Sequence, residues 1–152
     1  MDDKKKQEYL AMIDDNIAKH GFHVTYVMEQ KDFTPFGYST GLFKSFGIPE
    51  VFISGLPNGL TNTLICNYAE KLKDEKIPIL EFIDELIDRF PVYLTRVAPS
   101  DLKEEILASF RLYENDEFEC LQIIFPDLNG KFPHETGYDY DQKIFGELMK
   151  SA

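Results

Sequence analysis

Five residues of this sequence have the spacing of a serine nucleophile. Residues 37–41 read Gly-Tyr-Ser-Thr-Gly and fit G-x-S-x-G, in which a serine sits on a sharp turn between a strand and a helix. Asp127 and His134 follow Ser39 in the order of serine, acid and histidine that such hydrolases use. Only five residues separate this pattern from the next glycine, which is too short for the supporting helix. We therefore interpret residues 37–41 as part of a β-strand whose glycines permit a bulge or a close backbone approach.

Metal and cysteine chemistry is less well supported still. The chain has three histidines, which are His20, His23 and His134. None of them forms the H-x-x-x-H or H-E-x-x-H spacing of a zinc site. Cys66 and Cys120 each lie in an apolar run and are expected to be small buried side chains rather than nucleophiles. The sequence thus predicts no metal site, no cofactor and no catalytic residue.

The charge of the chain favours a different kind of function. The net charge is −11 and the isoelectric point is about 4.6, with a larger acidic surplus in residues 101–152 than in residues 1–100. Such a chain repels nucleic acids and anionic membrane surfaces, so we expect neither as a partner. It attracts basic proteins. A bacterial immunity protein that occludes a toxin such as a nuclease, by presenting carboxylates where the toxin expects phosphate, is the natural example.

Carboxylates interleaved with tyrosines are the candidate contacts for such a partner, because tyrosine is a frequent anchor at interfaces. These residues are Tyr113, Glu114, Asp116, Glu117, Glu119, Glu135, Tyr138, Asp139, Tyr140 and Asp141. The alternative interpretation is a solvated acidic surface that keeps the protein in solution. The sequence leaves both interpretations open, together with the oligomeric state.

Hydrophobic periodicity predicts a single α+β domain over residues 1–152, with a mixed, mostly antiparallel sheet packed against several helices. The first two strands are expected to form a hairpin through a turn at residues 31–35. The last strand, the most apolar, is expected at the centre. Strands are expected over 22–27, 36–43, 50–56, 92–97 and 118–125. Helices are expected over 5–20, 57–72, 79–87, 101–110 and 144–148.

The two cysteines and the start of the chain bear on location. Two cysteines without C-x-x-C spacing are typical of a reduced intracellular protein. No apolar stretch follows the charged residues 1–6, so we expect no signal peptide, and no apolar run is long enough for a membrane span. These features predict a cytoplasmic protein.

Three stretches resemble a known family. They are PFGYSTGL at 35–42, PEVFISGLP at 49–57 and LQIIFPDLNGKFP at 121–133. Together with a helix that ends in His20-Gly21, they resemble the bacterial domain-of-unknown-function family 4262 over about residues 15–145. The resemblance implies that the position of Ser39 is commonly threonine, a residue typical of strands. It implies no settled activity, substrate or cofactor.

A second function stays open beside the protein-binding one. A small hydrolase or small-ligand-binding protein would need a pocket formed by residues that lie far apart in the sequence. The candidates for that pocket are Tyr38, Ser39, Gln122, Asp127 and His134. A buried glutamine that faces a tyrosine and a hydroxyl is equally expected in a hydrogen-bonded core. On these grounds the sequence favours a binding protein over an enzyme.

Overall fold

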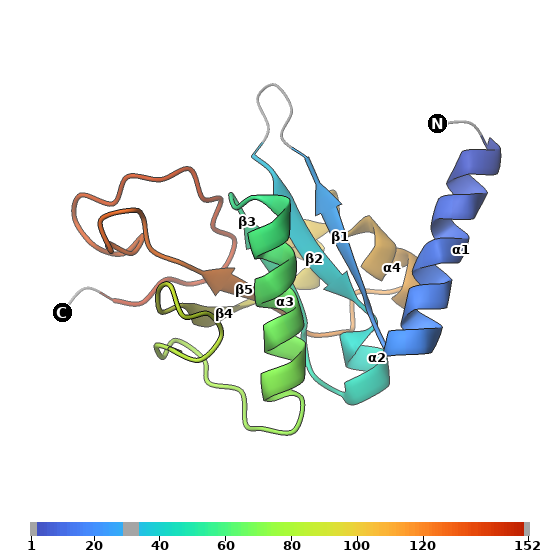
Figure 1. The fold of residues 1–152 in the computed structure, drawn as a ribbon, viewed down its shortest axis with the longest axis horizontal. Helices are drawn as coiled ribbons and strands as arrows, with labels where there is room; N and C mark the ends of the chain where they lie inside the picture. Colours follow the sequence, from blue (N-terminus) through green and yellow to red (C-terminus); the bar gives the residue numbers. More distant parts are fainter. Residues whose placement is uncertain (1–2, 29–33, 151–152) are drawn as a thin grey trace.

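Residues 3–28 and 34–150 are described by the computed structural model of the chain (Figure 1). The helical elements are α1 (Asp3–His20), α2 (Leu42–Phe46), α3 (Asn58–Leu72), the 3-10 helix η1 (Pro99–Leu102) and α4 (Leu107–Tyr113). The strands are β1 (His23–Val27), β2 (Phe36–Thr40), β3 (Glu50–Ser54), β4 (Tyr93–Val97) and β5 (Cys120–Ile124).

The strands form one sheet in the order β1-β2-β3-β5-β4. Neighbouring strands are antiparallel except β3 and β5, which are parallel because the chain crosses over through α3 and β4 between them. The α+β fold and the hairpin of β1 and β2 are therefore confirmed, although residues 31–33 of the expected turn lie outside the described residues. β5 is an inner strand, but the central position belongs to β3.

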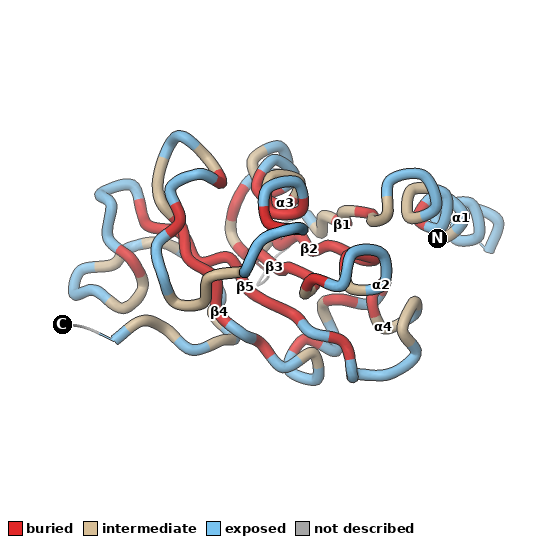
Figure 2. The backbone as a smooth tube through the Cα atoms, turned by 90° about the horizontal axis from the view of Figure 1, so that it is seen from below, coloured by how far each residue is buried: buried red, intermediate tan, exposed pale blue. Residues whose placement is uncertain are grey.

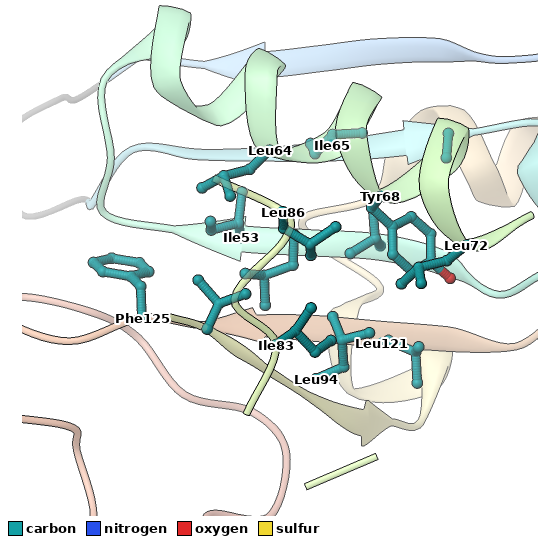
Figure 3. Packing of buried hydrophobic residues seen from close by; sticks show 14 of the residues in the cluster. Ile53, Leu64, Ile65, Tyr68, Leu72, Ile83, Leu86, Leu94, Leu121 and Phe125 are labelled. Atoms are coloured by element: carbon teal, nitrogen blue, oxygen red, sulfur yellow. The ribbon is translucent and has the colours of Figure 1, made fainter. Parts of the chain in front are cut away.

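Helix α3 covers one face of the sheet. Its Leu64, Ile65 and Tyr68 belong to the same buried cluster as Ile53 of β3 and Leu121 of β5 (Figure 3). All five side chains are almost fully buried, and such burial of a large apolar side chain contributes about 1.5–3 kcal/mol. This packing follows from the sequence, since α3 places an apolar residue one turn after another and β3 alternates between its two faces.

The opposite face of the sheet is covered by η1, α4 and the C-terminal segment. Phe52 and Tyr38 lie there in a second cluster with Leu102 and Ile106. Helix α1 lies at the side of β1 and is exposed along most of its length (Figure 2). Ile13 is the buried residue of this helix, which is consequently the least integrated element of the described fold.

The helix expected over residues 79–87 is wrong. The backbone bends there and runs along the edge strand β4, where Leu80 N donates to Leu94 O at 2.8 Å and Ile83 pairs with Val92. Ile83 and Leu86 are buried nevertheless. Their spacing suits a bent segment as well as a helix, and the open edge of β4 supplies backbone partners that a helix would not use.

The C-terminal helix expected over residues 144–148 is also wrong, because this segment is irregular and lies on the sheet. Phe145 stacks edge-on against Phe52 and its N–H donates to the Gln122 side chain at 2.9 Å. A Cβ at Gly146 would lie 2.7 Å from Arg96 O, so only glycine allows this approach. The helix expected over 101–110 is divided into η1 and α4, since Ile106 between them is not helical.

Candidate functional site

Ser39 lies near the end of β2 and is fully buried. Its Oγ donates to Glu50 Oε1 at 2.7 Å and accepts the Val51 N–H at 2.9 Å. The paired register of β2 and β3 ends at Tyr38 and Phe52, so the hydroxyl continues the hydrogen bonding of the two strands by one further step. Both capacities of this hydroxyl are therefore used for holding the strands together.

Glu50, the first residue of β3, collects donors from three elements. Its carboxylate accepts the backbone N–H groups of Gly41, Leu42 and Phe43 at 2.9, 3.2 and 3.2 Å. It also accepts the Ser39 and Tyr113 hydroxyls, and its side chain is buried. The first N–H groups of a helix have no partner within the helix, and Gly41 has no side chain to cap them. Glu50 supplies that cap from the neighbouring strand.

A nucleophile elbow requires a strand followed by a glycine and then a helix. This order of elements is thus present in short form. Gly41 has a φ of 112° and the five-residue α2 follows directly, which the sequence did not lead us to expect. In a hydrolase, N–H groups at such a helix stabilise the negative charge that develops on the substrate. Here the negative Glu50 already occupies them, and this geometry favours a structural role for Ser39.

Tyr113, a predicted partner-binding residue, points its hydroxyl inward instead. The hydroxyl donates to Glu50, and the ring packs against Phe43 and Phe118. Burial and the negative charge of Glu50 raise the pKa of the Tyr113 phenol. The phenol therefore acts as a hydrogen-bond donor that joins α4 to α2 and β3.

Tyr38 and Gln122 face each other across β3, because both are in register with Phe52. The Tyr38 hydroxyl accepts the Ala108 N–H at 3.0 Å, and burial raises its pKa. Gln122 Nε2 donates to Lys143 O at 2.6 Å, and the side chain is fully buried. The pair thus anchors α4 on one side and the C-terminal segment on the other.

Asp127 organises the turn that follows β5. Its Oδ1 accepts the N–H groups of Asn129 and Lys131, and its Oδ2 accepts that of Asp139, each at 2.9 Å. The bonds from Asp139 and Lys131 are the largest causes that lower the pKa of Asp127. The His134 ring packs against the rings of Tyr93 and Phe132. Ser39 and Asp127 belong to two separate hydrogen-bond networks.

A cleft of about 770 Å³ lies between the start of α3, residues 89–91 and the turn after β5. Its lining is mainly apolar, with Arg89 and Asp127 as the charged members. Of the five predicted pocket residues only Asp127 lines this cleft, while the other four make the internal contacts given above. The structure thus does not gather the five residues around this cavity.

The predicted carboxylates are all exposed, and they form two groups at opposite ends of β5 (Figure 1). We call residues 114–119 the acidic turn and residues 135–141 the acidic loop. The five-residue β5, a strand of about 15 Å, lies between them in the sequence. Tyr138 and Tyr140 are half-buried, and their hydroxyls bond to Gln142 Nε2 and Gly55 O. They fix the acidic loop to the body of the domain.

The other side chains that could take part in chemistry are the two cysteines and the potential metal ligands. Cys120 is buried as expected, whereas the expectation is wrong for Cys66, which is only half-buried. Both are free thiols, and desolvation raises the pKa of both, which disfavours the nucleophilic thiolate. Within residues 3–28 and 34–150, no three or more His, Cys, Asp or Glu side chains are placed to hold a metal ion. None of the helices in those ranges is both long and apolar enough to span a membrane.

The fold and the site define a mixed α+β domain whose apparent catalytic residues hold the sheet, α2 and the C-terminal turn in place. A model of the family described as Domain of unknown function (DUF4262) matches residues 16–139, and the chain belongs to this family. The match includes both the Glu50 cap and the Asp127 turn, as the sequence resemblance predicts. No curated protein and no solved structure matches the chain.

We predict that Glu50→Gln lowers the free energy of unfolding by about 3 kcal/mol, because the amide nitrogen would face backbone N–H donors in a buried site. Denaturant titration followed by circular dichroism measures this value. Glu119→Gln is the matched control, since Glu119 is exposed and pairs with Arg96 at 3.4 Å. It should change the value by less than about 0.5 kcal/mol. Equal losses in the two variants would contradict the capping role.

The hydrogen bonds to the Asp127 carboxylate predict how the stability of the fold depends on pH. A carboxyl whose pKa is lowered on folding from its usual 3.8 stabilises the fold above that value, and the contribution is lost as the pH falls through the folded-state pKa. We therefore expect Asp127→Asn to be less stable than the wild type at pH 7, with the difference shrinking as the pH falls below about 3.8 toward the lower folded-state pKa. Asp139→Asn, an exposed change in the acidic loop, is the control. A difference between wild type and Asp127→Asn that is independent of pH would refute the assignment.

Proposed function

We propose that this domain is a non-enzymatic binding protein that engages a basic protein through its exposed carboxylates. An immunity protein that blocks a bacterial toxin is the example that fits this chemistry best. One contrast supports the proposal: the hydroxyl, amide and carboxyl groups with catalytic potential are engaged inside the domain, whereas the carboxylates of the acidic turn and acidic loop belong to exposed residues. Two of them, Glu135 and Asp141, also accept one hydrogen bond each, from Phe132 N–H and the Thr34 hydroxyl.

The exposed acids have few cations beside them. Within the part of the chain that the structure describes, Glu119 lies 3.4 Å from Arg96 and Asp141 lies 3.7 Å from Lys143, both in exposed positions. Exposed pairs of this kind are worth about 0–1 kcal/mol and open easily. Within residues 3–28 and 34–150, no Lys or Arg nitrogen lies within 4 Å of the carboxylates of Asp116, Glu117 or Asp139. Their charge is available to a partner.

Rigid presentation strengthens this proposal. The acidic loop is fixed by the Asp139 N–H to Asp127 bond and by the Tyr140 hydroxyl to Gly55 bond. Acids held on an ordered loop lose little entropy on binding, and a field of one sign accelerates the encounter with a basic surface. A cytoplasmic location is also part of the proposal, and the free cysteines support it.

Small-ligand binding is the second candidate, and the cleft of about 770 Å³ is the observation that favours it. That volume lies within the range of ligand pockets, and an arginine and an aspartate border it. The residues that would perform hydrolysis are engaged elsewhere, so a hydrolase has less support from the geometry than a binder. Saturable binding of a small metabolite in this cleft would favour the second candidate.

Affinity capture with two charge variants tests the proposal. The tagged chain is expressed in its native host, and the captured proteins are identified by mass spectrometry. Asp116→Lys/Glu117→Lys reverses two acids of the acidic turn, and Asp139→Lys/Asp141→Lys reverses two acids of the acidic loop. Both change the net charge equally, so each controls for the other. We expect a basic protein to be captured by the wild type and lost, by about tenfold, in one of the two variants.

Salt provides a further check on the same capture, since attraction between exposed charges weakens as ionic strength rises. A captured protein that is acidic, or a basic one that both variants retain fully, would contradict the proposed function. The unfolding midpoint of each variant is measured beside the capture, because Asp141→Lys also removes the hydrogen bond from the Thr34 hydroxyl. A variant that keeps its midpoint but loses the partner has lost a contact and not its fold.

A further inference from the structure

The cleft has the composition of an interface groove. Leu60 lines it from α3, Phe90 from the segment before β4, and Phe125 and Tyr140 from the chain after β5. The Tyr140 hydroxyl donates to Gly55 O at 2.6 Å, so this wall is tied to the end of β3. A Cβ on Gly55 would lie 2.6 Å from Asp141 O, which shows how closely the chain after β5 approaches the end of β3. The groove is thus formed by fixed elements.

Leu128 stands at the rim of this groove with 98% of its surface exposed. It lies in the turn that Asp127 closes, where Gly130 N donates to Asp127 O and Asp127 N donates to Lys131 O. An apolar side chain this exposed, on a turn this well hydrogen-bonded, gains nothing from the fold itself. It does extend the apolar wall of the groove outward into solvent.

Two acids of the acidic loop adjoin Tyr140, which lines the groove. The Asp139 N–H donates to the Asp127 carboxylate, which also lines the groove. Asp139 and Asp141 are exposed, and the Asp141 carboxylate in addition accepts the Thr34 hydroxyl at 2.8 Å and lies 3.7 Å from Lys143. Arg89 is the cation of the lining and belongs to the segment on the far wall. Positive groups of a partner are consequently attracted to the side of Asp139 and Asp141.

We infer that this groove is the docking site for the basic partner, and that it takes an aliphatic or aromatic side chain flanked by lysine or arginine. The inference rests on the proposed function and selects the acidic loop over the acidic turn. An apolar anchor in a groove with a charged rim is the arrangement by which interfaces combine affinity with specificity. The acidic turn has carboxylates but lies beside a smaller cavity lined mostly by polar and charged residues.

Site-specific crosslinking in the native host tests the location directly. The photoreactive residue p-benzoylphenylalanine replaces Leu128 in one variant and Asp116 in the other, since both positions are exposed. After irradiation, the crosslinked peptides are identified by mass spectrometry. We expect the variant at 128 to crosslink to a basic protein, within a peptide that contains an apolar residue next to lysine or arginine. Adding Asp139→Lys/Asp141→Lys should reduce that crosslink about tenfold.

Other outcomes distinguish the docking site from the function. A basic protein crosslinked at 116 and not at 128 would overturn the docking site and leave the proposed function standing. Absence of a basic protein at both positions would overturn both. A crosslink at 128 to an acidic or neutral protein, unchanged by the two lysines, would also overturn both.

Leu128→Ser completes the test with a quantitative readout. Because the side chain is almost fully exposed, the change should leave the unfolding midpoint unaltered. We expect it to weaken binding of the crosslinked partner, once purified, by about tenfold, the size typical of an anchor residue. Leu107→Ser is the matched control, since Leu107 is exposed at the start of α4. Equal affinities of the two variants for the partner would overturn the anchor role of Leu128.

Discussion

A buried carboxylate that has no Lys, Arg or His nitrogen within 4 Å among residues 3–28 and 34–150 is the interaction on which this fold depends. Burying such a charge is costly, and only hydrogen bonds to the charged form offset the lost solvation. Glu50 receives five such bonds, three from the start of α2 and two from the hydroxyls of Ser39 and Tyr113. Strand β3, helix α2 and helix α4 thereby meet at one side chain. A small helix without a cap of its own is held against the sheet as a result.

This constraint also bears on which groups remain available at the surface for binding. The polar groups with catalytic potential form hydrogen bonds within the domain, in the Glu50 network, at the Gln122 amide and in the Asp127 turn. These hydrogen bonds hold the C-terminal segment on the sheet and the acidic loop beside the cleft. In the function that we propose, binding depends on exposed groups such as Asp139 and Leu128. Rigid support beneath an adaptable surface is a common basis for recognition.

Local sequence patterns predicted most of this architecture and little of its internal chemistry. The hairpin, α3 and β5 follow from short-range periodicity, which the structure confirms. The helix expected over 79–87 failed because partners for that backbone come from β4, which a local pattern does not include. Glu50 was overlooked as a site residue, since a single acid at the start of an apolar strand gives no sign of its five donors. Tyr113 was assigned to the surface because its contact with Glu50 spans 63 positions.

Fluorophosphonate labelling of the folded chain, followed by peptide mass spectrometry, tests most directly whether Ser39 serves the structure rather than a reaction. Such a probe reacts with a serine that is accessible and activated. Ser39 is expected to stay unmodified in the native protein, since its oxygen is buried between Glu50 and the Val51 N–H. Rapid, stoichiometric modification of Ser39 that disappears when the protein is unfolded would contradict it.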